Sequence, residues 1–335
     1  MSSPKDVATV KRNLHAGRRT SGGLRLDVFT PDELAGIHLG TLDVLERTGV
    51  WVEDEEAREI LAGAGARVQA DGVVKIPGHV VEDAIRSTPS RFVMYGRDPK
   101  HDVVLEDGRV NFLNFGEGVF VIDPETGERR LTMKKDVGDC SRVIDALPQL
   151  DAILRPVGAH DVPEQVGPLH NAEAIFTNCS KHAVIGPITG YLAARMREMA
   201  AAIAGGAENL RERPIFSYVV CPISPLKLPR DVCDVLIEGA REGVPTSVVS
   251  MALAGGSSPV NLAGAVVMHN AEVLSALTLA QSTRRGASLI YGSSTTALDL
   301  RSATATVGSP ECALINASIA CLARHYGLPS WVAGL

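Results

Sequence analysis

The chain has 335 residues, of which 45% are hydrophobic, and its 33 basic and 39 acidic side chains give a net charge of −6. This length and composition suffice for a large buried core, and α/β barrels commonly use this much chain as one domain. The acidic balance argues against nucleic acid or an anionic membrane as the main partner.

The first third of the chain is predicted to form a polar arm and a small α+β layer. Residues 1–23 are polar and basic, which is typical of a loose arm. Thr30 begins a helix-start pattern, with Pro31 at the first helical position and Glu33 three residues after the cap. The layer, residues 24–108, is expected to hold helices at about 31–47, 54–64 and 78–87 and strands at 91–95 and 102–105.

From residue 109 onward, short apolar strands alternate with helices. The expected strands are 109–115, 152–157, 182–185, 215–221, 247–252, 288–291 and 331–333. Helices are expected to begin near residues 134, 164, 191, 230, 259 and 309. Strands that are buried on both faces and followed by helices indicate a parallel sheet. About seven strands are present, so residues 109–335 are predicted to form a (β/α)₈ TIM-type barrel that lacks its seventh helix and eighth unit.

An open doubly wound sheet is the alternative fold, but no glycine-rich phosphate-binding turn follows its first strand. In barrels, reactive groups follow the carboxyl ends of the strands. The segment 255–259, rich in Gly and Ser, leads into a helix and could either bind an anion or simply begin that helix. The hydroxyls of 291–296 could face a pocket or satisfy their own turn. The segment Gly308–Glu311 could supply a reactive carboxylate or be simply a helix start in which Glu311 complements the helix dipole.

The tetrapeptide His-Asn-Ala-Glu occurs twice, at His170–Glu173 and His269–Glu272, and both copies fall in predicted helices. Such a pair could bind metal, but packed or solvated polar faces are the commoner outcome, and no metal site is predicted. The six cysteines form no C-x-x-C pair, which favours buried thiols in a reducing compartment. No signal segment and no long uncharged apolar run is found, so a cytoplasmic protein that does not bind membranes is expected.

Several motifs resemble a known family when they are taken in order. They are S-M-A-L-A-G-G-S-S-P-V from Ser250, H-N-A-E-V-L-S from His269, Y-G-S-S-T-T from Tyr291, G-S-P-E from Gly308 and Y-G-L-P-S from Tyr326. Earlier ones are F-T-P-D-E-L from Phe29, P-S-R-F-V from Pro89, G-R-D from Gly96, P-I-F-S from Pro214 and C-P-I-S-P-L from Cys221. Over nearly the whole chain this series is similar to the trimethylamine methyltransferase family.

The resemblance implies a barrel that transfers a methyl group from trimethylamine to the Co(I) of a corrinoid carried by a separate protein, releasing dimethylamine. The chain itself would bind no cofactor directly and is expected to form a homo-oligomer. Members that use methylamines carry pyrrolysine soon after the Y-G-L-P-S element. The resemblance therefore implies that position 336 is pyrrolysine, encoded by an amber codon, and that the present sequence ends before it.

A site for a trimethylammonium cation is expected to offer carboxylates and aromatic faces. The predicted catalytic side chains, besides the residue after Leu335, are those of Glu311, Glu117 and Tyr291. The predicted substrate-binding side chains are those of Phe115, Met251, Ser293, Ser294, Glu272 and Trp331.

Two other functions remain open at this point. One is a related corrinoid-dependent methyltransferase acting on glycine betaine or another quaternary amine. The other is a non-catalytic remnant or binding module, because an open barrel exposes unpaired strand edges and apolar surface. The 335-residue fragment alone is expected to be inactive.

Overall fold

The computed structural model describes residues 27–106 and 108–333, and the predicted arm at 1–23 lies outside them. By their contacts the described residues form two compact units. Unit 1 comprises residues 92–185 and 195–217, and unit 2 comprises residues 27–91, 186–194 and 218–333. The units do not follow the predicted division at residue 108, because the N-terminal helices pack within unit 2 on a late helix of the chain.

Unit 1 is built on the parallel strands β8 (Ala152–Leu154) and β9 (His182–Ile185), which pair in register from Ala152 and His182. The start of β10 (Phe216–Val220) continues this unit, and the Phe216 ring meets that of Phe176 edge-on with centroids 5.8 Å apart. Helices α4 (Lys134–Ala146) and α5 (Gly167–Asn178) pack against each other. The core of this unit therefore lies between its strands and these helices.

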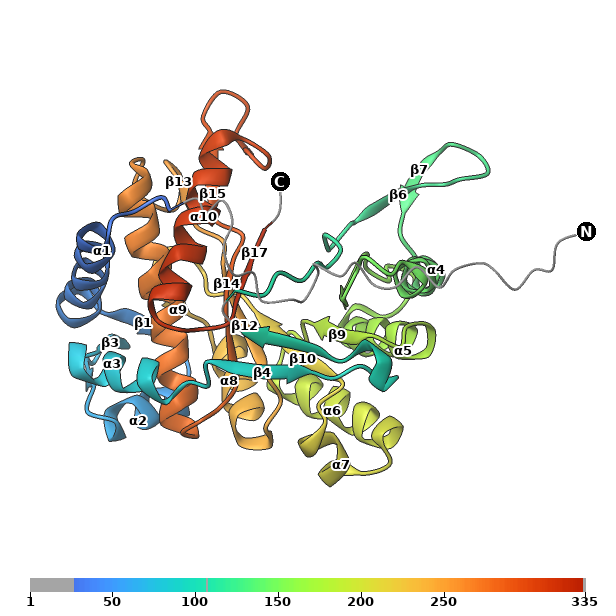
Figure 1. Cartoon of the computed structure of the whole chain (residues 1–335), viewed down its shortest axis with the longest axis horizontal. Coiled ribbons are helices and arrows are strands. Elements are labelled where there is room, and N and C mark those ends of the chain that lie inside the picture. Colours follow the sequence, from blue (N-terminus) through green and yellow to red (C-terminus); the bar gives the residue numbers. More distant parts are fainter. Residues whose placement is uncertain (1–26, 107, 334–335) are drawn as a thin grey trace, which may run out of the picture. The chain divides into compact units, whose positions relative to one another are not determined.

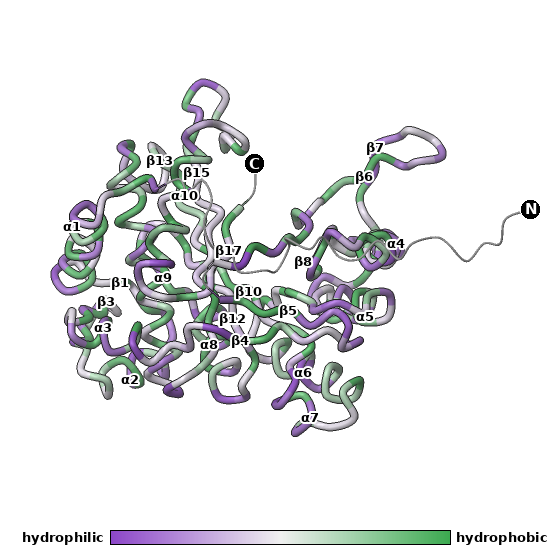
Figure 2. Tube along the Cα trace, in the orientation of Figure 1, coloured by the Kyte–Doolittle hydropathy of each residue, from purple (hydrophilic) through white to green (hydrophobic). Residues whose placement is uncertain are grey.

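The smaller elements of unit 1 are mostly hairpins and short helices. Strand β4 (Arg91–Met94) pairs with β5 (Val103–Glu106), and β6 (Phe120–Ile122) pairs with β7 (Arg129–Leu131). The β6–β7 hairpin stands out from α4 and α5 in Figure 1, and Figure 2 colours β6 as apolar. Short helices occupy Pro99–His101, Glu164–Val166 and Ala207–Glu212, while α6 (Gly190–Ala204) runs across the division between the units.

The strand predicted at residues 109–115 does not form as a regular strand. Only isolated parallel bridges occur there, from Leu113 to Ala152 and from Gly118 to Val157. Between them the Asn114 side chain replaces ladder bonds: it donates to Leu154 O at 2.8 Å and accepts from Leu154 N at 3.0 Å. A side chain at Gly116 would collide with Arg155 O, 2.6 Å from an ideal Cβ, so this close approach requires glycine.

Unit 2 is centred on parallel strands. The end of β10, β12 (Thr246–Ser250), β14 (Leu289–Ser293) and β17 (Ser330–Val332) follow one another, with Val220 beside Val248 and Tyr291 beside both Val248 and Ser330. One helix follows each of the first three strands: α8 (Arg230–Glu242) after β10, α9 (Leu262–Thr283) after β12 and α10 (Pro310–His325) after β14. Together with the strands of unit 1, this repeated parallel strand–helix order is the predicted α/β barrel fold.

Helix α9 is the core of unit 2. It packs against α1 (Pro31–Asp43), α2 (Glu55–Gly63), α3 (Gly78–Ser87), α8 and α10, as well as β12 and β14. Among the described helices it alone is long and apolar enough to cross a membrane, but 78% of that window is buried inside the protein. Its apolar composition is therefore explained by packing on every side.

Two further small sheets complete unit 2. One joins β11 (Lys227–Leu228), β1 (Val50–Val52), β3 (Val73–Lys75) and β2 (Arg67–Val68), beside a π-helical turn at Val44–Thr48. The other joins β13 (Leu253–Ala254), β15 (Thr296–Asp299) and β16 (Thr304–Ala305). The second sheet follows directly on the carboxyl ends of β12 and β14, so it extends the edge where the site was predicted.

Candidate functional site

The unit 2 sheet has one face that meets α9 and one that faces away from it. Tyr291 on β14 and Ser250 on β12 both hydrogen-bond side chains of α9, which identifies the helix-facing side. Because successive side chains alternate, the intervening residues point to the opposite face. In a barrel that opposite face is the interior, so the alternation sorts the predicted site residues into two groups.

Glu272 lies on α9 itself and meets the helix-facing side of the sheet at Ser250. Its carboxylate, fully buried in the middle of α9, accepts hydrogen bonds from Ser250 Oγ at 2.6 Å, Ser224 Oγ at 2.9 Å and Leu226 N at 2.9 Å. Burial raises the pKa of this carboxyl, while the three donors act to lower it. Glu272 thus fastens the segment after β10 and the end of β12 to the helix, and its oxygens are already occupied rather than open to a substrate.

Tyr291 also lies on the helix-facing side. It is fully buried and donates from its hydroxyl to Asn270 Oδ1 at 2.6 Å. Asn270 in turn donates to Thr41 Oγ1 at 2.9 Å and to the Tyr326 hydroxyl at 2.8 Å. Burial raises the pKa of Tyr291 well above its usual value. These bonds join α1, α9, the end of α10 and β14, so the Tyr291 hydroxyl, which stays a predicted catalytic group, is engaged inside the core of unit 2.

His269, one residue earlier on α9, is also fully buried. Its Nδ1 lies 2.9 Å from Thr295 Oγ1, and its Nε2 has no hydrogen-bond partner among the described residues. Burial lowers the pKa of this imidazole to about 3, so the ring is neutral at pH 7. Ser293 is likewise buried, and its Oγ accepts from Thr295 N at 3.1 Å within the turn after β14.

The opposite face carries the other group of predicted residues. The register sets Val249, Gly292 and Trp331 in one row, and a Cβ on Gly292 would come within 2.7 Å of the Val249 side chain. Beyond this row, toward the carboxyl ends of the strands, come Met251 and Ser294. Met251 is 53% exposed, Ser294 and Trp331 are half-buried, and all three are uncharged.

Glu311 lies in the first turn of α10, where it is exposed. Ser309 caps this helix by accepting from Cys312 N at 3.2 Å, and Pro310 occupies the first helical position. A carboxylate there complements the helix dipole. The helix-start interpretation of this segment is confirmed, and the structure also leaves the carboxylate of Glu311 accessible.

Phe115 and Glu117 lie in unit 1, in the segment that bridges to β8. The Phe115 side chain is 74% exposed. Glu117 forms an ion pair with Arg155 at 2.6 Å, and the Arg155 side chain is largely buried. The charge of Glu117 is thus matched locally by an arginine.

The two His-Asn-Ala-Glu copies do not gather ligands. On α5, His170 and Glu173 both contact Lys134 Nζ, whereas on α9 the His269 and Glu272 side chains have separate partners. No group of three or more His, Cys, Asp or Glu side chains in residues 27–106 and 108–333 is arranged to hold a metal ion. Packed or solvated polar faces, the commoner outcome anticipated for such pairs, describe both copies.

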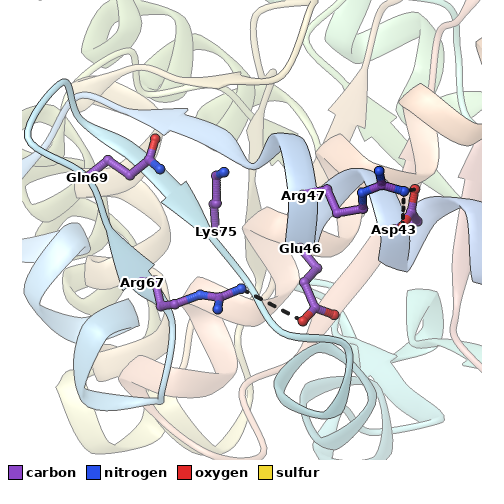
Figure 3. Close-up of a pocket in the computed structure, with 6 residues that line it drawn as sticks. All are labelled: Asp43, Glu46, Arg47, Arg67, Gln69 and Lys75. Atoms are coloured by element: carbon purple, nitrogen blue, oxygen red, sulfur yellow. Dashed lines mark hydrogen bonds and ion pairs between the residues drawn. The ribbon is translucent and has the colours of Figure 1, made fainter.

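A polar hollow of about 720 Å³ lies in unit 2 beside the end of α1, the π-helical turn and strands β2 and β3 (Figure 3). Its lining residues are Asp43, Glu46, Arg47, Arg67, Gln69 and Lys75. Arg47 pairs with Asp43 at 3.3 Å and Arg67 with Glu46 at 3.8 Å. None of the predicted site residues lines this hollow, so we do not assign the site to it.

Two residues after β10, Cys221 and Ser224, were not among the predicted site residues. Cys221 is exposed and follows β10 at the level of Val249, on the face opposite α9. Ser224 precedes a cis peptide bond to Pro225 and binds Glu272. The C-P-I-S-P motif marks this segment, but only the structure shows that its serine points to the helix.

Comparison with known proteins identifies the family. The model of the trimethylamine methyltransferase (MTTB) family matches residues 6–335. The chain belongs to this family. The trimethylamine methyltransferase of Desulfitobacterium hafniense (strain DSM 10664 / DCB-2) is 50% identical over 329 residues, which are 98% of this chain and 66% of that protein.

Two further relatives are similar over most of the chain. The trimethylamine methyltransferase of Methanosarcina barkeri is 45% identical over 331 residues, covering 97% of this chain and 67% of that protein. A glycine betaine methyltransferase of Desulfitobacterium hafniense (strain Y51) is 31% identical over 311 residues, covering 91% of this chain and 64% of that protein. The chain thus spans about two thirds of the length of these relatives.

Solved structures support the fold. The monomethylamine methyltransferase of Methanosarcina barkeri superposes with a TM-score of 0.54 at 12% identity, covering 90% of this chain and 67% of that one. A hydroxylamine complex of the methyltransferase MtmB gives the same TM-score at 13% identity, covering 90% of this chain and 66% of that one. At such low identity the likeness concerns the fold alone, and it agrees with the predicted TIM-type barrel.

Proposed function

We propose that the whole protein is a trimethylamine:corrinoid protein methyltransferase that moves one methyl group from trimethylamine to Co(I) and releases dimethylamine. The observation that carries the proposal is the gradient of similarity. Over nearly the whole chain, identity is 50% and 45% to two trimethylamine methyltransferases but only 31% to a glycine betaine methyltransferase.

The face of the sheet opposite α9 suits such a substrate. Trimethylamine is a cation at neutral pH with three apolar methyl groups. Trp331 offers a ring face for a cation–π contact, and Met251 offers a polarisable apolar surface. Ser294 lies in the same row as Met251, and this face provides no lysine or arginine at these positions to repel the cation.

One carboxylate is favoured over the others as the partner of the cation. Glu272 accepts three hydrogen bonds inside the core, and Glu117 is paired with Arg155. Glu311 is exposed at the start of α10, and no hydrogen bond or ion pair occupies its carboxylate in the described part of the chain. We therefore assign Glu311 the task of attracting the amine.

The cobalt would be supplied by a separate corrinoid protein, and in its Co(I) state it provides both electrons of the new bond to carbon. This chain would bind the amine, orient one methyl group outward and exclude water from the nitrogen. If trimethylammonium is the bound form, the nitrogen leaves with its proton as neutral dimethylamine, so no further acid is needed. The protein is proposed to act in the cytoplasm.

The test is methyl transfer by the full-length protein to its reduced corrinoid partner. We expect trimethylamine to convert the Co(I) absorbance to that of the methylated corrinoid, and glycine betaine to leave it unchanged. Methylation from glycine betaine alone would assign the protein to the other substrate class. No methylation from either amine, with a partner shown to accept methyl groups from another donor, would contradict the proposal.

We also propose that pyrrolysine follows Leu335, on the ground of the family resemblance. Sequencing the gene beyond the codon for Leu335 tests this directly. An amber codon followed by an open frame with family-like sequence is expected. An ordinary sense codon at that position, or another stop codon followed by unrelated sequence, would refute a pyrrolysine enzyme.

A further inference from the structure

The β6–β7 hairpin of unit 1 has two chemically different faces. The register pairs Phe120 with Leu131, Val121 with Arg130 and Ile122 with Arg129. Cross-strand partners share a face, and neighbours along a strand do not. Phe120, Ile122, Leu131 and Arg129 therefore form one face, which we call the apolar hairpin face, and Val121 and Arg130 form the other.

The second face fixes the hairpin to α4. The Arg130 guanidinium donates two hydrogen bonds to the Asp136 carboxylate, at 2.7 and 2.9 Å, and one to Asp123 Oδ2 at 3.0 Å. Asp136 is buried in the first turn of α4, and its Oδ2 also accepts from Met133 N at 2.8 Å. A bidentate arginine of this kind sets orientation as well as adding energy.

Hydrogen bonds also order both ends of the hairpin. At the base, the buried Thr132 donates from its hydroxyl to Gly158 O at 2.6 Å. At the tip, Asp123 Oδ1 accepts from Glu125 N at 3.0 Å and Thr126 N at 3.1 Å, and Gly127 takes a φ of 74° that favours glycine. The hairpin is thus anchored at its base and on one face, and its turn is closed by its own hydrogen bonds.

The apolar hairpin face is left open to solvent by this arrangement. Ile122 is 61% exposed, Leu131 51% and Phe120 45%. The Arg129 guanidinium lies 3.7 Å from the centre of the Phe120 ring and covers only part of it. An isolated two-stranded hairpin is marginal in water, and a contiguous exposed apolar patch marks an interaction site. Figures 1 and 2 show this hairpin standing out from the helices of its unit, with β6 coloured as apolar.

We propose that the apolar hairpin face packs against the same face of a second copy of the chain across a two-fold axis. In such a contact the same patch serves both partners, so it must complement itself. Phe120, Ile122 and Leu131 can meet their counterparts and exclude water. This contact does not depend on the amine chemistry proposed above.

The charges around the face favour a second copy over a strongly acidic or basic partner. Arg130 and Asp123 are already paired with each other and with Asp136. The remaining exposed charges are Arg129 on the face and Glu125 and Glu128 at the tip. Two hairpins that cross about a two-fold axis can set Arg129 of each copy beside the acidic tip of the other, whereas a partner of one sign would leave like charges opposed.

The test is the oligomeric state of the full-length protein, measured by sedimentation velocity over a hundredfold range of concentration. The double variant Phe120→Ser with Ile122→Ser should weaken self-association at least tenfold. Leu300→Ser is the matched control, because Leu300 is an apolar residue, 73% exposed, in unit 2. It should leave self-association unchanged, and all three proteins should have the same circular dichroism.

A crosslink gives an independent measurement. Ile122→Cys should form a disulfide between copies under mild oxidation, and the same experiment on Leu300→Cys should not. A protein that is monomeric at every concentration would overturn the proposal, as would an association constant unchanged in the double variant. Loss of binding to the corrinoid protein in the double variant, with the oligomer intact, would also overturn it by assigning the face to that partner.

Discussion

The same four residues, His-Asn-Ala-Glu, occur on α5 of unit 1 and on α9 of unit 2 in two opposite environments. On α5, Glu173 is half exposed and pairs with Lys134, which also contacts His170. On α9, Glu272 and His269 are fully buried and make separate hydrogen bonds inside the core. Identical side chains at identical spacing therefore form a surface ion pair on α5 and buried hydrogen bonds on α9.

The difference teaches that burial, rather than motif, decides what these side chains contribute. A surface ion pair adds little because water and salt compete with it. A buried carboxylate with three donors cannot be removed without leaving those donors unpaired. Four predictions test this contrast, taken from the largest expected effect to the smallest.

The largest effect is expected at the two glutamates. Glu272→Ala should lower the free energy of unfolding by about 4 kcal/mol, because two serine hydroxyls and one backbone N–H lose their acceptor inside the core. Glu173→Ala, the matched variant on α5, should cost less than about 1 kcal/mol. Urea denaturation of both full-length variants measures this, and equal losses would contradict the contrast.

The asparagines should differ by a smaller margin. Asn270 donates to Thr41 and Tyr326 and accepts from Tyr291, whereas the Asn171 side chain accepts a hydrogen bond from Ala159 N at 3.0 Å. We expect Asn270→Ala to cost about 3 kcal/mol and Asn171→Ala about 1 kcal/mol. Thermal unfolding of the two variants compares them, and a larger loss for Asn171→Ala would break the pattern.

The buried histidine should make stability depend on pH. The pKa of His269 is lowered from 6.5 to about 3 in the folded protein, so below pH 6.5 the unfolded chain takes up the proton first. Its contribution is constant above pH 6.5 and becomes unfavourable as pH falls toward 3, reaching about 2 kcal/mol at pH 5.

The variant His269→Leu isolates this effect. Burial raises the pKa of Glu272, and that carboxyl acts in the opposite sense, gaining stability as it is protonated at lower pH. Glu272 is present in both proteins and cancels in the comparison. The free energy of unfolding of the wild type minus that of His269→Leu should therefore fall by about 2 kcal/mol from pH 7 to pH 5. A difference independent of pH would refute a neutral buried imidazole.

The smallest effect is expected at Lys134. Lys134→Met removes the cation shared by Glu173 and His170 and should cost less than about 1 kcal/mol at low salt. The cost should fall further in 1 M NaCl, where charges are screened over about 3 Å. Denaturation curves at two salt concentrations measure it, and a large cost unaffected by salt would place this pair among the buried ones.

The fold could largely be predicted from the sequence because its signals are local. The cap at Thr30, the helix at 134–146 and the strand at 182–185 follow from capping residues and apolar runs, and the structure confirms them. The strand predicted at 109–115 was wrong because the Asn114 side chain and two close-packed glycines replace regular pairing there.

The site was predictable only in part. From β8 onward the strand ends were predicted to within three residues. The sequence does not tell which face of a fully buried strand a residue occupies when both faces are apolar. The structure places Tyr291 and Ser293 on the side of the sheet that faces α9, the helix that carries Glu272. It places Met251, Ser294 and Trp331 on the opposite side. The partners of Glu272 come from segments 22 and 48 residues away, which no local pattern reveals.

The most direct test of the account compares one residue from each face in the full-length enzyme. Trp331→Leu should lower kcat/KM for trimethylamine about tenfold or more, mainly through KM, and leave the melting temperature nearly unchanged. Tyr291→Phe should lower the melting temperature and leave kcat/KM within about threefold. The reverse pattern, with activity lost at Tyr291 and kept at Trp331, would contradict the assignment of the substrate to the face opposite α9.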